Sequence, residues 1–174
     1  KTCPQKSFTI LEGRENIGGT WDLFKYPGIR SDSDMHTMGF RFKPWTDPKT
    51  IAEGPSIIKY LKEAVEENNL QEKIQFRKKV ISASWNTSEA MWTLEVEEQS
   101  NKSIELMSCN ILYLCGGYYN YDEGYTPQFK GQNNFQGKII HPQKWPEDLD
   151  YLGKKVVVIG SGATAVTIIP SMAE

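Results

Sequence analysis

Histidine and cysteine are scarce in this sequence. It has two histidines, His36 and His141, and three cysteines, Cys3, Cys109 and Cys115, among 174 residues. These side chains are the usual ligands of zinc, and here they lack the spacing of a metal site. We therefore expect no bound metal. An odd number of unpatterned cysteines favours a reduced, cytoplasmic protein over a disulfide-stabilised secreted one.

The sequence also lacks a long apolar run and an excess of one charge. No stretch approaches the roughly 20 apolar residues of a membrane-spanning helix, and the first residues do not resemble a signal peptide. The net charge is −2, with 20 basic and 22 acidic residues interspersed. We expect neither a nucleic-acid nor a transmembrane role. With 39% hydrophobic and 24% charged residues, the composition is typical of a globular protein with room for one domain and part of a second.

Hydrophobic periodicity divides the chain into segments. A short buried strand is expected at 7–11, and a helix at 55–69 has an apolar stripe that we assign to the core. The glycine-, proline- and aromatic-rich stretch 13–48 has no regular period, and an irregular stretch of that length usually serves a ligand.

Apolar residues alternate from residue 74 onward and predict further strands at 74–76, 80–85, 91–97 and 103–108. Continuous apolar runs predict buried parallel strands at 111–115 and 155–159.

The second of these runs opens into the pattern G-x-G-x-x-A. Two glycines permit a tight turn and close approach of a phosphate, and the helix that follows directs its positive end at a pyrophosphate. This loop predicts one nucleotide half-site. Its residues are Gly160, Ser161, Gly162, Ala163, Thr164 and Ala165. The residue that separates NAD from NADP lies about 20 positions further on and falls outside the sequence.

A second half-site is indicated near the start of the chain. Glu12 follows the strand at 7–11, where an acidic residue accepts hydrogen bonds from a ribose. Gly18 and Gly19 let the backbone approach a ligand, and Trp21 offers a flat face for a ring system. The alternatives are a solvated glutamate and a glycine turn beside a packed tryptophan.

The most specific pattern is F-x-G-x-x-x-H-x-x-x-W-P, formed by Phe135, Gly137, His141, Trp145 and Pro146. It resembles the fingerprint of type I Baeyer–Villiger monooxygenases, whereas flavin-containing monooxygenases usually have tyrosine at the position of Trp145. The alternative is that these side chains only pack a linker. The resemblance, strongest to the ethionamide-activating members of the family, extends to further segments at 18–34, 42–45, 116–125 and 145–150.

The resemblance implies a doubly wound, Rossmann-like α/β fold with a three-stranded β-meander. It implies an FAD-binding domain at 1–117, an interdomain linker with the fingerprint at 118–153, and the start of an NADPH-binding domain at 154–174. Because only eleven residues precede Glu12, we expect a truncated chain without the central first strand and its glycine-rich loop. We also expect the C-terminal βα unit at 155–174 to fill that vacant slot by pairing with 8–11 and 111–115, within one chain or exchanged between two.

Roles for single residues follow from the resemblance. Glu12 would bind the adenosine ribose beside the Gly18–Gly19 pair, and Val80 would offer its backbone to adenine. Asp32 would lie beside the flavin and orient a catalytic arginine that this chain does not contain. Further assignments are Thr20 and Trp21 to the flavin, Arg30 and Ser31 to NADP, and His141 to the coupling of domain movements.

The activity implied is oxygenation of a ketone or a sulfide by O₂, with NADPH reducing FAD and the reduced flavin forming a C4a-peroxyflavin. The alternatives are a flavin-containing N- or S-monooxygenase and an inactive nucleotide-binding module. We expect the chain alone to be inactive, and its incomplete sheet predicts a homodimer.

Overall fold

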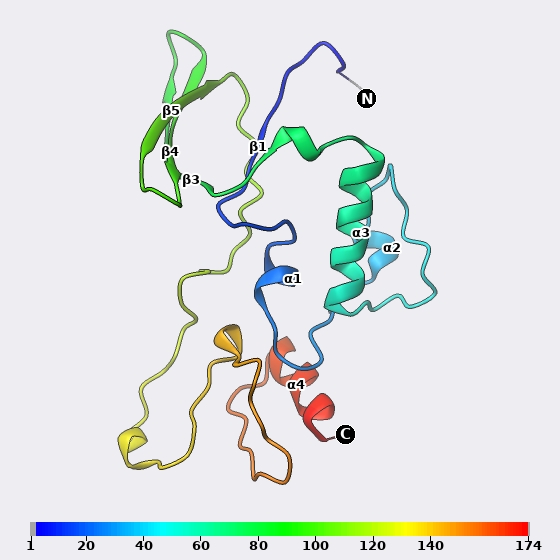
Figure 1. The fold of residues 1–174 in the computed structure, drawn as a ribbon, viewed down its shortest axis with the longest axis vertical. Helices are drawn as coiled ribbons and strands as arrows, with labels where there is room; N and C mark the ends of the chain where they lie inside the picture. The colour runs from blue at the N-terminus through cyan, green and yellow to red at the C-terminus, as the bar shows by residue number, and fades with distance from the viewer. Residues whose placement is uncertain (1–2, 174) are drawn as a thin grey trace. The chain divides into compact units, whose positions relative to one another are not determined.

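The computed structural model describes residues 3–173, and the chain divides into two compact units. Unit 1 consists of Lys1–Gly19 and Leu61–Gly117, and unit 2 consists of Thr20–Tyr60 and Tyr118–Glu174. The long helix α3 (Gly54–Glu67) contains one of the unit boundaries. Strands occur only in unit 1 among the described residues, so the chain is a mixed α/β protein (Figure 1).

A short parallel pair, β1 (Ile10–Leu11) and β2 (Ile74–Gln75), begins unit 1. The expected strand at 7–11 is thus reduced to its last two residues. Backbone pairing continues just beyond it, since Glu12 N–H donates to the Gln75 carbonyl at 2.9 Å and Lys78 N–H donates to the Glu12 carbonyl at 2.9 Å. These two backbone hydrogen bonds therefore hold Glu12 in place at the end of the strand. A short 3₁₀ helix, η1 (Gln71–Lys73), leads into β2.

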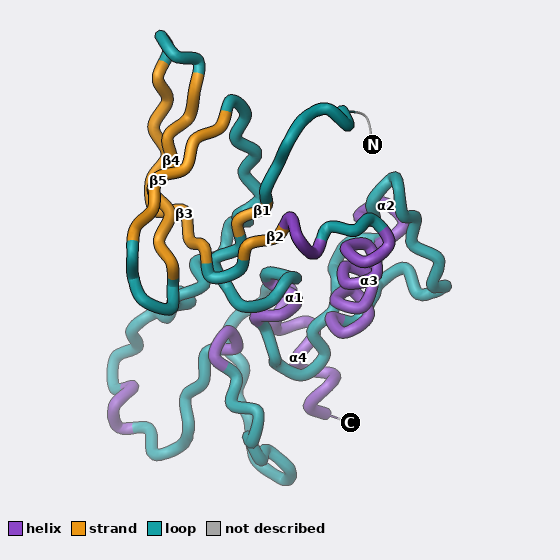
Figure 2. Tube along the Cα trace, turned by 45° about the horizontal axis from the view of Figure 1, so that its top comes forward, coloured by secondary structure: helices purple, strands orange, loops and turns teal. Residues whose placement is uncertain are grey.

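The three-stranded meander is confirmed. Strands β3 (Lys78–Asn86), β4 (Met91–Glu98) and β5 (Ile104–Cys109) form an antiparallel sheet with β4 in the centre (Figure 2). Leu94 and Val96 of β4 are buried on one face. Trp85 and Trp92 lie opposite one another across β3 and β4, with ring centroids 5.4 Å apart. Such cross-strand aromatic pairs stabilise the register of a hairpin.

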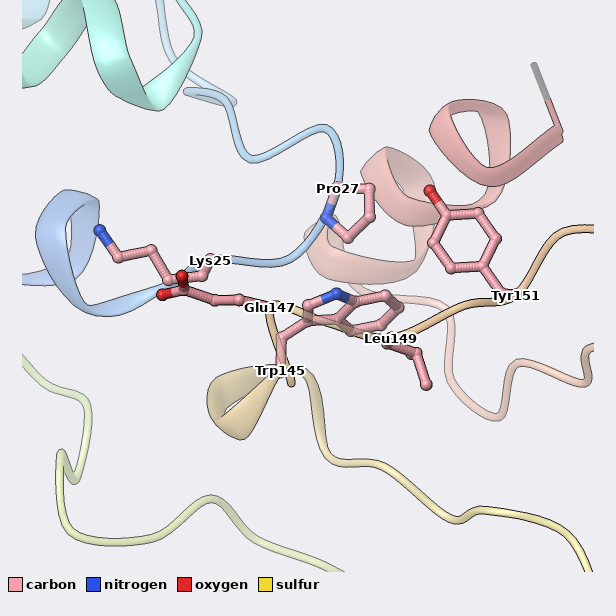
Figure 3. Close-up of a pocket in the computed structure, with 6 residues that line it drawn as sticks. All are labelled: Lys25, Pro27, Trp145, Glu147, Leu149 and Tyr151. Carbon is pink, nitrogen blue, oxygen red and sulfur yellow. The ribbon is translucent and has the colours of Figure 1, made fainter.

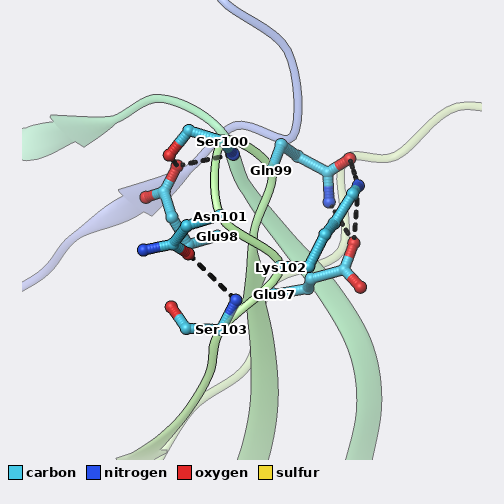
Figure 4. A network of polar contacts seen from close by, with 7 residues as sticks. All are labelled: Glu97, Glu98, Gln99, Ser100, Asn101, Lys102 and Ser103. Carbon is cyan, nitrogen blue, oxygen red and sulfur yellow. Dashed lines mark hydrogen bonds and ion pairs between the residues drawn. The ribbon is translucent and has the colours of Figure 1, made fainter.

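Polar contacts close the turn between β4 and β5 (Figure 4). The carboxylate of Glu98 accepts hydrogen bonds from Ser100 Oγ at 2.8 Å and from Ser100 N–H at 3.2 Å. Lys102, with a φ of 60°, places its ammonium 3.2 Å from Glu97 Oε1. Both glutamates have a pKa below the ordinary 4.5, Glu97 chiefly through its hydrogen bond from Lys102 and Glu98 chiefly through that from Ser100.

Unit 2 begins with two short helices inside the stretch that we expected to be irregular. They are α1 (Thr20–Leu23) and α2 (Met35–Met38). Helix α2 starts where Asp34 accepts a hydrogen bond from His36 N–H at 2.8 Å, the usual N-cap arrangement. Single-turn helices of this kind have no periodicity for a sequence pattern to reveal.

The helix expected at 55–69 is confirmed as α3, and its apolar stripe faces the core. Ile57, Tyr60 and Ala64 are buried. The part of α3 in unit 2 packs through Tyr60 against Trp45, with ring centroids 5.4 Å apart. The Tyr60 hydroxyl also donates to the Lys43 carbonyl at 2.5 Å, which ties the preceding loop to the helix.

Helix α4 (Ala163–Ala173) forms the core of unit 2 with the segment after α1. Ile168 of α4 is buried against Phe24 and Tyr26, and Trp145 packs on the same cluster. The chain between β5 and α4 is otherwise loop, with the short helices η2 (Gln132–Asn134) and η3 (Pro142–Lys144) (yellow to orange in Figure 1).

Two expected strands do not form. Residues 111–115 and 155–159 are irregular backbone in this structure, and their side chains lie largely open to solvent, with Leu114 81% and Val157 84% exposed. Within one chain, the expected pairing of the C-terminal unit with 8–11 and 111–115 is therefore wrong: among the described residues β1 pairs only with β2. The exchange of this unit between two chains stays a prediction. A parallel strand needs a neighbour that offers its hydrogen-bonding edge, and neither segment has one. The glycine loop and helix of that unit form without the strand.

Candidate functional site

The glycine pair and the acid expected to bind FAD lie together in unit 1. Glu12 Oε1 accepts a hydrogen bond from Arg14 N–H at 2.8 Å, and the Arg14 guanidinium donates to the Gly19 carbonyl at 2.9 Å. Gly18 and Gly19 have φ values of 114° and 50°. These backbone conformations favour glycine. Arg14 thus links the acid to the glycine pair, a role that no pattern in the sequence indicated.

Val80 lies near this cluster in β3. An ideal Cβ on Gly13 would be 3.6 Å from the Cβ of Lys79, so the residue before Val80 lies beside the residue after Glu12. A bulge between Val80 and Ser82 interrupts the pairing of β3 with β4. Unit 1 therefore brings together Glu12, the glycine pair and Val80. A small hollow close by is lined by Gly13, Glu15, Arg77, Gln99 and Ser100.

Thr20 and Trp21 open helix α1 at the start of unit 2, and both are half-buried. The hydroxyl oxygen of Thr20 lies 3.4 Å from that of Tyr121, which fixes the first turn of α1 to the loop after residue 117. Thr20 of the predicted flavin-lining pair thus has a defined partner within its own unit.

Arg30, Ser31 and Asp32 occupy three different environments. Arg30 is exposed and forms a backbone bridge to Glu53. Ser31 is 2% exposed, and its hydroxyl accepts a hydrogen bond from Ala52 N–H at 3.0 Å. Asp32 is exposed, with Ser33 Oγ 3.4 Å from Oδ1. Arg30 and Asp32 are therefore exposed to solvent, whereas Ser31 is buried and holds the loop.

One tyrosine that no pattern assigned to the site, Tyr119, lies close enough to Asp32 to feel its charge. The rings of Tyr118 and Tyr119 are 4.7 Å apart, and Tyr119 packs edge-on against Phe24 at 5.2 Å. The pKa of the Tyr119 phenol is raised by a hydrogen bond with Tyr118, then by burial, and further by the negative charges of neighbours that include Asp32. The signal available in the sequence was the density of tyrosines after residue 117.

The fingerprint lies in unit 2 around η3. His141 precedes this helix, and its Nδ1 accepts a hydrogen bond from Gln143 N–H at 3.2 Å. Gln143 is 9% exposed and donates from its amide to the Asn120 carbonyl at 2.6 Å. Trp145 packs on the Phe24 cluster and lies 6.3 Å from the Tyr151 ring. Trp145 is therefore part of the core of unit 2, while His141 lies in the adjacent loop.

The glycine loop before α4 has an open backbone. An added Cβ on Gly160 or Gly162 would meet no atom within 4 Å, so the backbone is open to an approaching group. Gly160 has a φ of 135°. Ser161 is exposed, and helix α4 starts at Ala163 as expected, followed by the half-buried Thr164 and the buried Ala165. The positive end of the helix therefore faces an open loop.

A shallow cavity of about 540 Å³ lies beside the fingerprint. Figure 3 shows Lys25 and Glu147 at one end and Tyr151 at the other, with Pro27 and Trp145 between them. Leu149 completes the lining. This hollow does not contain the residues assigned to the cofactors, although Trp145 belongs to both the cavity and the fingerprint. Among the described residues no cluster of three or more potential metal ligands occurs, and no helix in residues 3–173 is long and apolar enough to span a membrane.

A glycine pair beside a strand-end acid, and a second glycine loop before a helix, are features of proteins that bind dinucleotides. The family model described as flavin-binding monooxygenase-like matches residues 38–174. The chain belongs to this family.

Relatives with curated names match almost the whole chain. The FAD-containing monooxygenase EthA of Mycolicibacterium smegmatis is 60% identical over 170 residues, which cover 98% of this chain and 34% of that protein. The probable FAD-binding monooxygenase AlmA of an Acinetobacter species is 55% identical over 174 residues, covering 100% of this chain and 35% of that protein. The chain thus spans about a third of the length of these relatives.

Several solved monooxygenase structures are similar to this chain. A steroid monooxygenase bound to NADP superposes with a TM-score of 0.77 at 29% identity, over 95% of this chain and 32% of that one. OTEMO in complex with FAD and NADP gives a TM-score of 0.75 at 26% identity, over 99% of this chain and 33% of that one. A closed form of cyclohexanone monooxygenase gives 0.71 at 27% identity, over 95% of this chain and 31% of that one.

Proposed function

We propose that this chain supplies cofactor-binding elements of an FAD- and NADPH-dependent monooxygenase. Its substrate would be a ketone, oxidised in a Baeyer–Villiger reaction, or a sulfide, with O₂ as the oxidant. The observation that carries the proposal is the 60% identity to an FAD-containing monooxygenase over 98% of the chain. Similarity to cyclohexanone and steroid monooxygenases supports the ketone class.

The residues of unit 1 fit the adenosine part of FAD. One carboxylate oxygen of Glu12 is used by Arg14 N–H, and the second is the candidate acceptor for ribose hydroxyls. Gly18 and Gly19, in conformations that favour glycine, would let the backbone approach the cofactor. Val80, at the bulge of β3, would offer its backbone to adenine.

The residues of unit 2 fit the flavin ring and NADPH. Thr20 and Trp21 would line the flavin, and Asp32 would orient an arginine supplied by another part of the protein. The loop Gly160–Ala165 would hold the NADPH pyrophosphate. Arg30 would lie on its approach, and the buried Ser31 would hold the loop that carries Arg30. When bound, the two cofactors would supply hydride transfer and oxygen activation, while these side chains bind, orient and exclude water.

His141 is the remaining member of the proposed machinery. Its Nδ1 accepts a hydrogen bond from Gln143 N–H, so the proton of the neutral imidazole is on Nε2. This side chain would couple movement of the fingerprint to cofactor binding instead of acting as an acid or base.

The experiment that tests the proposal has two parts. The purified chain is titrated with FAD and followed by flavin absorbance and fluorescence. A protein of full family length that contains this sequence is then assayed for NADPH oxidation with a cyclic ketone, a thioether and an amine, with ¹⁸O₂ traced into the product. Ester formation supports the Baeyer–Villiger class. Oxygenation of only the amine or thioether would favour an N- or S-oxygenating flavin-containing monooxygenase, and turnover of no substrate would leave a nucleotide-binding module.

Turnover by the chain alone is not expected, because it spans only about a third of the length of the relatives that it matches. Steady NADPH consumption coupled to ketone or thioether conversion by the isolated chain would contradict this.

We also propose that the protein is cytoplasmic and that copies of the chain associate through the apolar runs at 111–115 and 155–159. The three cysteines are free thiols, which supports a reducing compartment. The exposure of Leu114 and Val157 supports association, because large apolar patches are usually covered.

A further inference from the structure

Gly124 lies directly against the imidazole of His141. An ideal Cβ on Gly124 would be 2.5 Å from Nε2 and 2.6 Å from Nδ1, and closer still to Cε1. Its φ lies outside the left-handed region in which glycine is favoured. The backbone at Gly124 would therefore accept any residue, and only the neighbouring ring requires a glycine.

The loop that carries Gly124 contacts the fingerprint a second time. Four residues earlier, the Asn120 carbonyl accepts the 2.6 Å hydrogen bond from the buried amide of Gln143. Because Gln143 N–H also donates to His141 Nδ1, one glutamine fixes both the loop and the ring. Between these two contacts, Tyr121 lies 3.4 Å from the Thr20 hydroxyl.

From this geometry we propose that Gly124 is a positioning residue for His141. Because Gly124 lacks a Cβ, it leaves room for the imidazole and holds it with Nδ1 toward Gln143 N–H. The segment 120–124 thereby links the fingerprint to Thr20, the first residue of α1. The link to Thr20 deepens the proposed monooxygenase function and rests on it. The positioning of His141 by Gly124 does not depend on that proposed function.

The test uses the 174-residue chain and two readouts. Long-range ¹H–¹⁵N spectra of the imidazoles report which ring nitrogen carries the proton, and His36 serves as an internal reference because the chain has only two histidines. Urea unfolding is measured for Gly124→Ala, His141→Ala and the double variant. The matched control is Gly116→Ala, where an added Cβ would meet no atom within 4 Å and the φ is likewise outside the left-handed region.

We expect Gly124→Ala to displace the ring, shift the His141 nitrogen signals away from the Nε2–H tautomer and leave those of His36 unchanged. The unfolding equilibrium constant should rise roughly tenfold or more, as for other overpacked sites. In the His141→Ala background the same change should cost less than about twofold, because the clash has been removed. If Gly124→Ala does not fold but the double variant does, the inference is also supported.

The inference is overturned if Gly124→Ala leaves the His141 signals unchanged, or if it destabilises the His141→Ala background equally. It is also overturned if the double variant fails to fold. Titration with FAD is scored separately, so failure to bind flavin would count against the proposed function while the imidazole spectra still decide the role of Gly124.

Discussion

Gly28 lies against Thr167 of α4 so closely that an added Cβ would be 2.5 Å from the Thr167 carbonyl oxygen and closer still to Ser171 Oγ. Gly28 also has a φ of 76°. The turn after Tyr26 therefore needs glycine for its backbone conformation and for the approach of the helix.

Replacing Gly28 with alanine should destabilise unit 2. The left-handed conformation costs about 1–2 kcal/mol for a residue with a Cβ, and overpacking adds about 1–3 kcal/mol. The measurement is urea unfolding followed by near-ultraviolet circular dichroism. Gly131→Ala is the matched control, since its φ is 82° but the nearest atom lies at 3.7 Å, so it should show the conformational cost alone. Equal losses for both variants would mean that contact with α4 contributes nothing.

The sequence predicted more of the candidate site than of the sheet. The strand-end position of Glu12, the glycine pair that includes Gly18, and the fingerprint that includes His141 made these residues candidates, because each belongs to a pattern that is local in the sequence. No sequence pattern indicated Arg14, whose contacts with Glu12 and Gly19 depend on the path of the folded loop. Tyr119 and Gly124 were not indicated because they contact residues that are farther away in the sequence. The strands at 111–115 and 155–159 were predicted from apolar content, which reports that a segment prefers burial but does not supply the partner strand whose hydrogen bonds it needs.

In a protein of full family length, Asp32→Ala should lower turnover roughly 100-fold or more, because a preorganised charge loses its orienting partner. FAD binding should be retained, since Asp32 is exposed and holds no part of the core. Stopped-flow flavin reduction and steady-state product formation measure the two effects. Glu89→Ala, at an exposed turn position, is the control. Unchanged turnover would remove Asp32 from the site.

The meander should lose stability in acid. The pKa values of Glu97 and Glu98 are lowered in the folded chain, so their ionised forms stabilise the fold above the ordinary value of about 4.5. That contribution is lost as the pH falls through the lowered values. Urea midpoints measured between pH 7 and pH 3 from the Trp85–Trp92 circular dichroism signal should fall with pH.

Glu98→Gln should flatten this dependence, because it removes one of the two carboxyl groups whose pKa is lowered in the folded chain. A pH profile for Glu98→Gln that matches the parent chain would show that Glu98 does not contribute.

Association of the chain should depend on the exposed apolar runs. Val157→Lys places a charge in the run at 155–159 and should lower the fraction of dimer or larger species. Light scattering coupled to size-exclusion chromatography, over a range of concentrations, measures that fraction. The exposed Glu123→Lys variant separates the loss of apolar surface from the effect of charge. A chain that is monomeric at every concentration would rule out the proposed association.

The central position of β4 also determines which part of the chain unfolds locally least often. It alone among the described strands has both edges paired, and its Val96 side chain is 0% exposed. Amide protons of β4 should therefore exchange with deuterium most slowly, while those of 111–115 and 155–159 should exchange almost at once. Strand β4, which contributes no residue to the proposed cofactor sites, would thus be the most persistent part of the native ensemble. The segment before the Gly160–Ala165 loop would be the most transient.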